Sequence, residues 1–195
     1  MRCHVVHGIL DPLGKAGILK LVPLLQAAGF ECLVPDYGFI TAVEAKLINP
    51  SLVGTIRPYV LPGDLWIAHS NGCAIGYHLL AAGAPFGGML LINPALQPNL
   101  SFPTGLRVIV CSNKGDDATV LAQAGAQAGL LDPVWGEMGH TGYIGSNPDV
   151  QNLFADRCPP LPLVDGHGDI FTDAKFAGAW GPRLVLCAAD LARGP

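Results

Sequence analysis

The sequence has few charged residues and no long uninterrupted apolar run. Only 13% of its 195 residues are charged and 50% are hydrophobic, which excludes an intrinsically disordered chain. The 11 basic and 15 acidic residues give a formal net charge of −4. No basic stripe is present, so we expect no nucleic-acid partner. The low charge leaves room for an apolar patch that serves a substrate or a second copy of the chain, and a homo-oligomer stays open.

Two further absences concern membranes and disulfides. Gly, Pro or His interrupts every apolar run before the roughly 18 residues that a membrane-spanning helix needs. The N-terminal stretch MRCHVVHGIL has too short an apolar run for a signal peptide. We therefore expect a cytoplasmic protein without a membrane span. The cysteines lack CxxC spacing, so we expect free thiols rather than disulfides at Cys3, Cys32, Cys73, Cys111, Cys158 and Cys187.

Apolar runs typical of strands alternate with stretches of helical spacing, and no repeat or linker divides residues 1–195. Because the strands are continuously apolar, they favour a mostly parallel sheet with helices on both faces. We predict a single domain, a three-layer αβα sandwich with six strands, and a long loop over residues 131–160. The predicted strands cover residues 3–8, 31–38, 64–70, 86–95, 105–113 and 162–166.

The stretch AHSNG, at the end of the third predicted strand, contains the strongest functional signal. Ser70 stands between a strand and a helix, with Ala68 and Gly72 two positions away on either side. This is the G-x-S-x-G pattern with Ala in its first place, and small residues there let strand and helix approach around an exposed hydroxyl. We predict that Ser70 is a nucleophile; the alternative is a serine that only caps the helix.

Four stretches together resemble the α/β-hydrolase family: VVHG, AHSNG, LLINPA and VIVCSNKGDD. The resemblance covers nearly the whole chain, although the first two strands of larger members would be absent and no cap domain fits after the fourth strand. It implies a small, lidless serine hydrolase that cleaves a carboxylic ester through an acyl-enzyme, with no cofactor. Amide, thioester and lactone substrates stay open.

The same resemblance implies the partners of Ser70. The acid should follow the fifth strand, where Asp117 with Val120 three residues on is favoured over Asp116. The base should precede the last helix, which favours His167 over His140. The oxyanion hole would use the backbone N–H groups of two residues, Ile9 and Asn71.

Three rival interpretations remain. Alternating Asp165, His167 and Asp169 could bind a hard metal, but no second ligand cluster accompanies them, and we expect no metal site. A nucleotide-binding sheet would need a phosphate-binding glycine motif after the first strand, and none is present. A non-catalytic protein of hydrolase fold, acting in binding or assembly, is the principal alternative.

Overall fold

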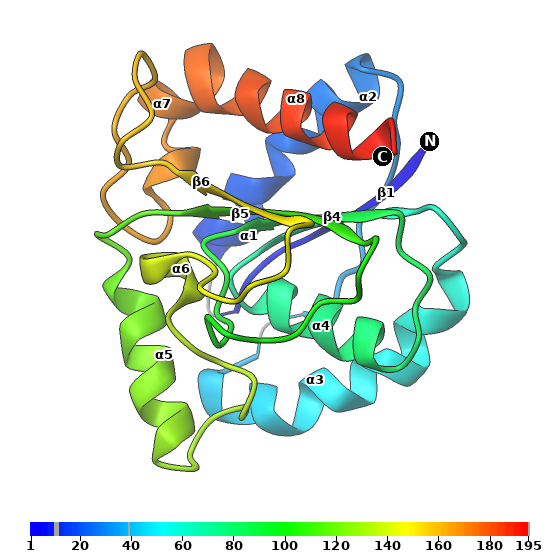
Figure 1. Ribbon diagram of the computed structural model, residues 1–195, viewed down its shortest axis with the longest axis vertical. Helices are drawn as coiled ribbons and strands as arrows, with labels where there is room; N and C mark the ends of the chain where they lie inside the picture. The colour runs from blue at the N-terminus through cyan, green and yellow to red at the C-terminus, as the bar shows by residue number, and fades with distance from the viewer. Residues whose placement is uncertain (10–11, 39, 195) are drawn as a thin grey trace.

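The computed structural model describes residues 1–9, 12–38 and 40–194, and one six-stranded sheet organises them (Figure 1). The strand order is β2-β1-β3-β4-β5-β6, and every neighbouring pair is parallel. This confirms the predicted fold class and makes the sheet fully parallel over these residues. The strands are β1 (Arg2–Val6), β2 (Glu31–Leu33), β3 (Leu65–His69), β4 (Gly88–Ile92), β5 (Arg107–Ser112) and β6 (Val150–Phe154).

Helices cover both faces of the sheet, so the molecule has three layers (Figure 1). One face carries α1 (Pro12–Leu19), α2 (Leu21–Ala27), α7 (Asp173–Lys175) and α8 (Gly181–Ala192). The other face carries α3 (Ala42–Ile56), α4 (Asn71–Ala81), α5 (Asp117–Gln127) and α6 (Met138–Thr141). Short 3-10 or π segments lie at η1 (Arg57–Tyr59), η2 (Asp169–Phe171) and η3 (Phe176–Trp180). No helix in the described ranges is both long and apolar enough to cross a membrane.

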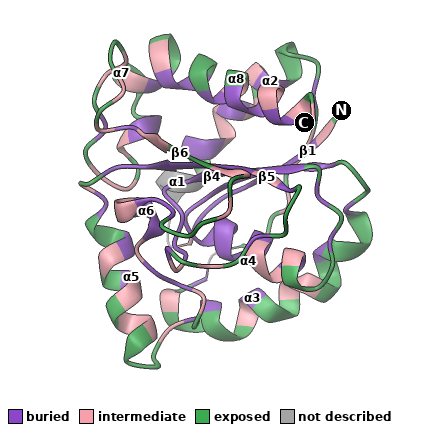
Figure 2. Ribbon diagram, in the orientation of Figure 1, coloured by how far each residue is buried: buried purple, intermediate pink, exposed green. Residues whose placement is uncertain are grey.

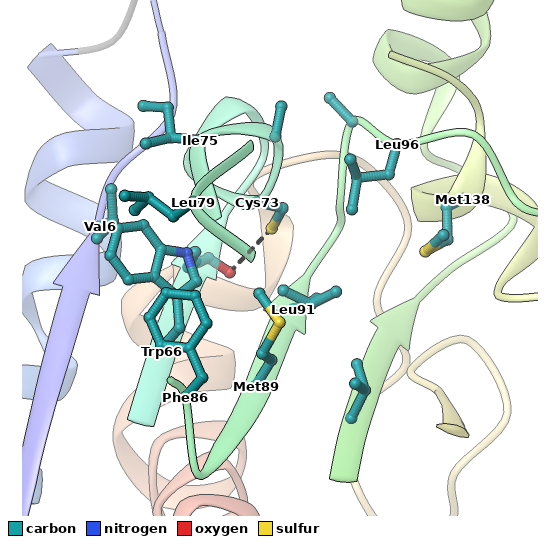
Figure 3. Packing of buried hydrophobic residues seen from close by; sticks show 14 of the residues in the cluster. Val6, Trp66, Cys73, Ile75, Leu79, Phe86, Met89, Leu91, Leu96 and Met138 are labelled. Atoms are coloured by element: carbon teal, nitrogen blue, oxygen red, sulfur yellow. Dashed lines mark hydrogen bonds between the residues drawn. The ribbon is translucent and has the colours of Figure 1, made fainter. Parts of the chain in front are cut away.

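The sheet separates two hydrophobic clusters, and the central strands are the most continuously buried elements (Figure 2). Because parallel strands covered on both faces bury alternate side chains in opposite layers, each of the central strands β1, β3, β4 and β5 contributes to both clusters. Figure 3 shows the cluster on the α4 side, where Trp66 of β3 and Met89 and Leu91 of β4 lie beneath Ile75 and Leu79 of α4. Buried apolar packing therefore fixes α4 against the strand end that precedes it.

The predicted last strand was misplaced. Residues 162–166 form no strand, and β6 lies instead at Val150–Phe154, within the segment interpreted as an unstructured loop. β6 pairs only with β5, so it is an edge strand, and its residues are exposed or half-buried. An edge strand of this kind lacks the continuous apolar run by which the central strands were identified.

Helix α3 positions two residues that matter below, Ala42 and Asn49. The helix begins at a capping box, in which the Thr41 side chain accepts from the Glu44 N–H while the Glu44 carboxylate accepts from the Thr41 N–H. Pro50 lies inside the helix, although proline cannot donate the hydrogen bond of a helix interior. The capping box fixes the start of α3 even though Pro50 removes one backbone hydrogen bond from its interior.

Candidate active site

Ser70 occupies a sharp turn between β3 and α4. Its backbone has φ 56° and ψ −124°, a conformation that non-glycine residues rarely adopt. Its side chain makes no capping hydrogen bond to α4, although Ser often caps a helix in this way. The strained backbone and the uncapped hydroxyl match a nucleophile turn better than the simple helix cap considered from the sequence.

The small residues around Ser70 are required by close packing. A Cβ at Gly72 would lie 2.6 Å from the carbonyl oxygen of His7, and a Cβ at Gly8 would lie 2.8 Å from Cβ of Ser70. Neither contact is compatible with a side chain. The end of β1 therefore passes directly beside the serine.

The peptide unit that joins Gly8 to Ile9 is held at its carbonyl end. His7 Nδ1 lies 2.6 Å from the Gly8 oxygen, and the Tyr37 hydroxyl lies 2.6 Å and 2.7 Å from the oxygens of His7 and Gly8. Burial raises the pKa of Tyr37, so its hydroxyl remains a donor. Because C=O and N–H of a trans peptide point in opposite directions, these contacts direct the Ile9 N–H away from Tyr37.

His167 and Asp116 form a hydrogen-bonded pair. His167 Nδ1 lies 2.8 Å from Asp116 Oδ1, and the Asp116 carboxylate is fully buried. An ionised carboxylate only accepts, so this geometry favours a proton on Nδ1, and in the neutral imidazole Nε2 then presents a lone pair. The same Oδ1 accepts from the Thr119 N–H at 3.3 Å, which makes Asp116 the N-cap of α5 as well.

The loop that carries His167 is anchored to the ends of three strands. The carbonyl oxygen of His167 accepts from His69 Nε2 at 3.0 Å and from Asn93 Nδ2 at 2.6 Å. Asn113 donates to the Asn93 side chain at 3.1 Å and accepts from the Gly166 N–H at 3.0 Å. Buried polar side chains bonded on several sides hold a loop in one geometry, so the imidazole position is set by β3, β4 and β5 together.

His69 acts in this anchor as a neutral side chain. Burial lowers its pKa to about 3, and the charge of protonated His167 and His7 acts in the same direction. Nε2 then donates to the His167 carbonyl, while the buried Nδ1 has no hydrogen-bond partner in the described chain. The His69 ring lies 4.7 Å from the His167 ring, so a charge on His69 would be unfavourable whenever His167 is protonated.

Ser70, His167 and Ile9 open onto one cavity of about 440 Å³. Its walls are otherwise mostly aliphatic, with one indole and one threonine, and His167 is its one ionisable side chain among the described residues. The remaining lining residues are Ala42, Ala95, Ala118, Thr119, Leu121, Ala122, Leu131 and Trp135. A pocket of this size and lining suits a small uncharged molecule.

The structure places Asp116, the alternative acid, against His167 and shows no direct hydrogen bond between Ser70 and His167 in the part of the chain that it describes. Asp117 is exposed at the start of α5, and the partner of His167 is Asp116 instead. The Asp-x-x-Val spacing was misleading, because only the residue before the helix directs its carboxylate toward the sheet edge. Among the described residues, Ser70 and His167 share the cavity without a direct hydrogen bond; such contacts often tighten only with substrate.

His140, the alternative base, lies elsewhere. It belongs to α6, does not line the cavity, and has a buried Nδ1 without a hydrogen-bond partner in the described residues. Its neighbour Gly139 instead packs against the acid: a Cβ there would lie 2.4 Å from Asp116 Oδ2. The segment around His140 therefore supports the His167 pair from outside.

The side chains of the considered metal cluster diverge. His167 turns to Asp116, whereas Asp169 pairs with Lys175. Over the described ranges, no three His, Cys, Asp or Glu side chains gather closely enough to hold a metal ion. Cys73, close to Ser70 in the chain, is buried, and burial raises its pKa, so it stays a protonated thiol.

Sequence reasoning missed Asn93 and Asn113, which hold the His167 loop. Both follow directly after an apolar strand, at the sheet edge where ligands bind in parallel sheets. Asn93 also has φ 43°, a left-handed value that Asn tolerates better than most residues. Polar residues at these strand ends were the available signal.

Comparison with known proteins gives no matching family model and no curated relative. Solved structures do match. The mouse α/β hydrolase domain-containing protein 10 has a TM-score of 0.62 at 10% identity, over 98% of this chain and 89% of that one. A pyrethroid hydrolase has a TM-score of 0.57 at 12% identity, over 100% and 98%.

The Paleococcus ferrophilus monoacylglycerol lipase has a TM-score of 0.56 at 13% identity, over 98% of this chain and 94% of that one. Structural similarity at sequence identities this low establishes a shared architecture, but it does not transfer an activity from those proteins to this chain. The six-stranded parallel sheet covered by helices on both sides matches the architecture of these neighbours, and the chain has the α/β-hydrolase fold.

Proposed function

We propose that the protein is a serine hydrolase that cleaves a small carboxylic ester, with Ser70 as nucleophile, His167 as base and Asp116 as acid. The observation that carries the proposal is the His167–Asp116 hydrogen bond of 2.8 Å, with His167 lining the same cavity as Ser70, an uncapped serine in a strained turn. Serine hydroxyls need such a base to act as nucleophiles.

In the first half-reaction, Ser70 Oγ attacks the ester carbonyl carbon while its proton passes to His167 Nε2. Asp116 holds the Nδ1–H tautomer and stabilises the imidazolium that forms. The tetrahedral intermediate then collapses, the bond to the alcohol oxygen breaks, and the alcohol leaves with the proton from Nε2. An acyl-enzyme on Ser70 remains.

The developing negative charge would be stabilised by two backbone N–H groups, those of Asn71 and Ile9. Asn71 is the first residue of α4, so its N–H has no partner within the helix, and the helix dipole adds positive potential. The Ile9 N–H is supported by the anchored Gly8 carbonyl described above. Removing one such donor typically costs about 10²–10³ in turnover.

In the second half-reaction, water enters beside the acyl-enzyme. His167 Nε2 accepts a proton from the water as its oxygen attacks the carbonyl carbon. The new intermediate releases the carboxylic acid, and Nε2 returns the proton to Ser70 Oγ. The mostly apolar cavity supports an uncharged acyl group, and an ester is the least demanding acyl bond for this chemistry.

The proposal is tested with an activated-serine probe and a panel of p-nitrophenyl esters. We expect fluorophosphonate to label the wild-type protein and not Ser70→Ala. Ester turnover should fall by about 10³-fold or more in both Ser70→Ala and His167→Ala, because triad members act as a unit. Kinetics and intact-protein mass spectrometry measure the two effects.

His140→Ala is the matched control, since it removes an imidazole that lies outside the cavity. It should retain labelling and most of the turnover. A wild-type protein that is folded but neither labelled nor active on any ester or thioester would refute the proposal. That outcome would favour the alternative, a hydrolase-fold protein that acts by binding alone.

A further inference from the structure

A network of polar side chains lies buried within the apolar cluster between α3 and α4. Asn49, Asn71 and Asp132 are all fully buried. Asn49 Nδ2 donates to Asn71 Oδ1 at 2.7 Å and to Asp132 Oδ2 at 2.8 Å, and Asn71 Nδ2 donates back to Asn49 Oδ1 at 3.0 Å. Burying polar groups costs free energy unless each is hydrogen-bonded. A buried polar network in place of apolar side chains therefore suggests a role other than packing.

One end of the network reaches the cavity. The indole Nε1 of Trp135 donates to Asn71 Oδ1 at 3.1 Å, and Trp135 lines the same cavity as Ser70. The Trp135 N–H donates to the Asp132 carbonyl at 2.9 Å, and the Asp132 carboxylate accepts from the Val134 N–H at 3.1 Å. Trp135 is thus held both by its indole N–H and by its backbone N–H.

The other end of the network approaches the surface. His78 Nε2 lies 2.9 Å from Asp132 Oδ2, and its side chain is 19% exposed. His78 belongs to α4, the helix that begins immediately after Ser70. The Asp132–Trp135 turn is therefore tied to the same helix at two points, Asn71 in its first turn and His78 in its last.

We propose that the Trp135 side chain forms a specificity-determining wall of the acyl site. The Asn71 side chain holds this wall in a fixed position relative to the oxyanion hole. This inference rests on the proposed function. Asn71 would serve twice: its backbone N–H faces the developing charge, while its side chain holds the indole. A wall fixed relative to the point of attack limits the size of the acyl group, so the substrate class is esters of short, uncharged acyl groups.

The inference predicts a change in selectivity rather than a general loss of activity. Trp135→Ala removes the wall, so the ratio of kcat/KM for octanoate to that for butyrate p-nitrophenyl esters should rise by about tenfold or more, the low end of what one methylene is worth in an apolar pocket. Trp135→Phe keeps an aromatic ring but loses the N–H that Asn71 accepts. Its ratio should move in the same direction by a smaller factor.

A buried substitution also lowers stability, so a stability-matched control is needed. Leu184 is fully buried on α8, in the cluster on the opposite face of the sheet. Leu184→Ala should lower Tm as large-to-small core substitutions do, yet leave the octanoate-to-butyrate ratio at its wild-type value. If Trp135→Ala does not fold, Trp135→Phe carries the test.

The two proposals fail in different ways. If the octanoate-to-butyrate ratio is unchanged in the folded Trp135 variants, while the wild type turns over esters and is labelled by fluorophosphonate, the proposed role of Trp135 is wrong and the proposed hydrolase activity stands. An equal shift in Leu184→Ala would also overturn it, because the effect would then follow stability alone. Absence of labelling and turnover in the wild type would overturn the underlying function, and the wall with it.

Discussion

Asp116 and Asp117 are adjacent in the chain but face different surroundings. Asp116 is fully buried, caps α5 and accepts from His167, whereas Asp117 is exposed on the first turn of the same helix. An asparagine at position 116 lacks the negative charge that stabilises the imidazolium, and its NH2 group can donate to Nδ1, so the histidine loses its preferred tautomer. The pair of neighbours therefore offers a direct test of the acid.

Asp116→Asn should lower ester kcat by roughly 10⁴-fold with little change in the far-UV spectrum, as expected for a triad held in the wrong tautomer. Asp117→Asn should stay near wild type, because its carboxylate contributes only a favourable charge at the helix N-terminus. Steady-state kinetics of both variants decides the matter. A severe loss in Asp117→Asn with an active Asp116→Asn would restore the assignment made from spacing.

At the scale of elements, α6 packs against Asp116, the residue that contacts His167. Its backbone approaches so closely that Gly139 leaves no room for a side chain beside Asp116 and Thr119, and the Gly139 oxygen accepts from the Asn113 N–H at 2.9 Å. The short helix is thus packed against the end of β5 and the start of α5. Any enlargement at this contact must move the acid or the helix.

Gly139→Ala should therefore reduce both stability and turnover. The new Cβ would lie 2.4 Å from Asp116 Oδ2 and 2.8 Å from Thr119 Cγ2, and overpacking of this kind costs about 1–3 kcal/mol. Differential scanning fluorimetry and ester kinetics measure the two losses. Gly54→Ala is the control, since Gly54 lies in α3 with nothing within 4 Å, and a helix gains up to about 1 kcal/mol from the change.

If Gly139→Ala were as active and stable as Gly54→Ala, the contact between α6 and the acid would be softer than the structure indicates. Helices α3 and α4 contact the site differently, through side chains. α3 carries Asn49 and Ala42, and α4 carries Asn71. Asn49 and Asn71 act through hydrogen bonds between uncharged side chains.

At the scale of the molecule, the pKa of His69 links stability to pH. The folded-state pKa is about 3, below the ordinary 6.5 of the unfolded chain. Between these values the unfolded state binds a proton that the folded state does not, so the free energy of unfolding falls as the pH is lowered from 6.5 toward 3. Protonation of His69 in the unfolded chain lowers the free energy of unfolding by up to about 1.4 kcal/mol for each pH unit in this range.

His69→Gln should flatten this part of the pH dependence, because an amide can still donate to the His167 carbonyl but does not titrate. Urea unfolding of both proteins at pH 7.5, 6 and 5 measures the difference. The wild type should lose more stability than the variant on acidification, since all other titrating groups are shared. Parallel curves would show that His69 is protonated in the folded state or is not buried as described.

The sequence by itself determined the central strands, the parallel sheet and the turn at Ser70, because these depend on local signals. A continuously apolar run specifies a strand covered on both faces, and small residues around a serine specify a tight turn. The placement of His167 before the last helix was also accessible, since it depends on chain order. No such signal marked β6, whose half-exposed residues become a strand only by pairing with β5.

Only the tertiary structure placed Asp116 rather than Asp117 against His167, and it alone brought Asn93 and Asn113 to the His167 loop. It also joined Asn49, Asn71 and Trp135, which are separated by 22 and 64 residues along the chain. The physical reason is the same in each case. Hydrogen bonds between distant side chains depend on where packed elements point them, and sequence spacing carries no record of that direction.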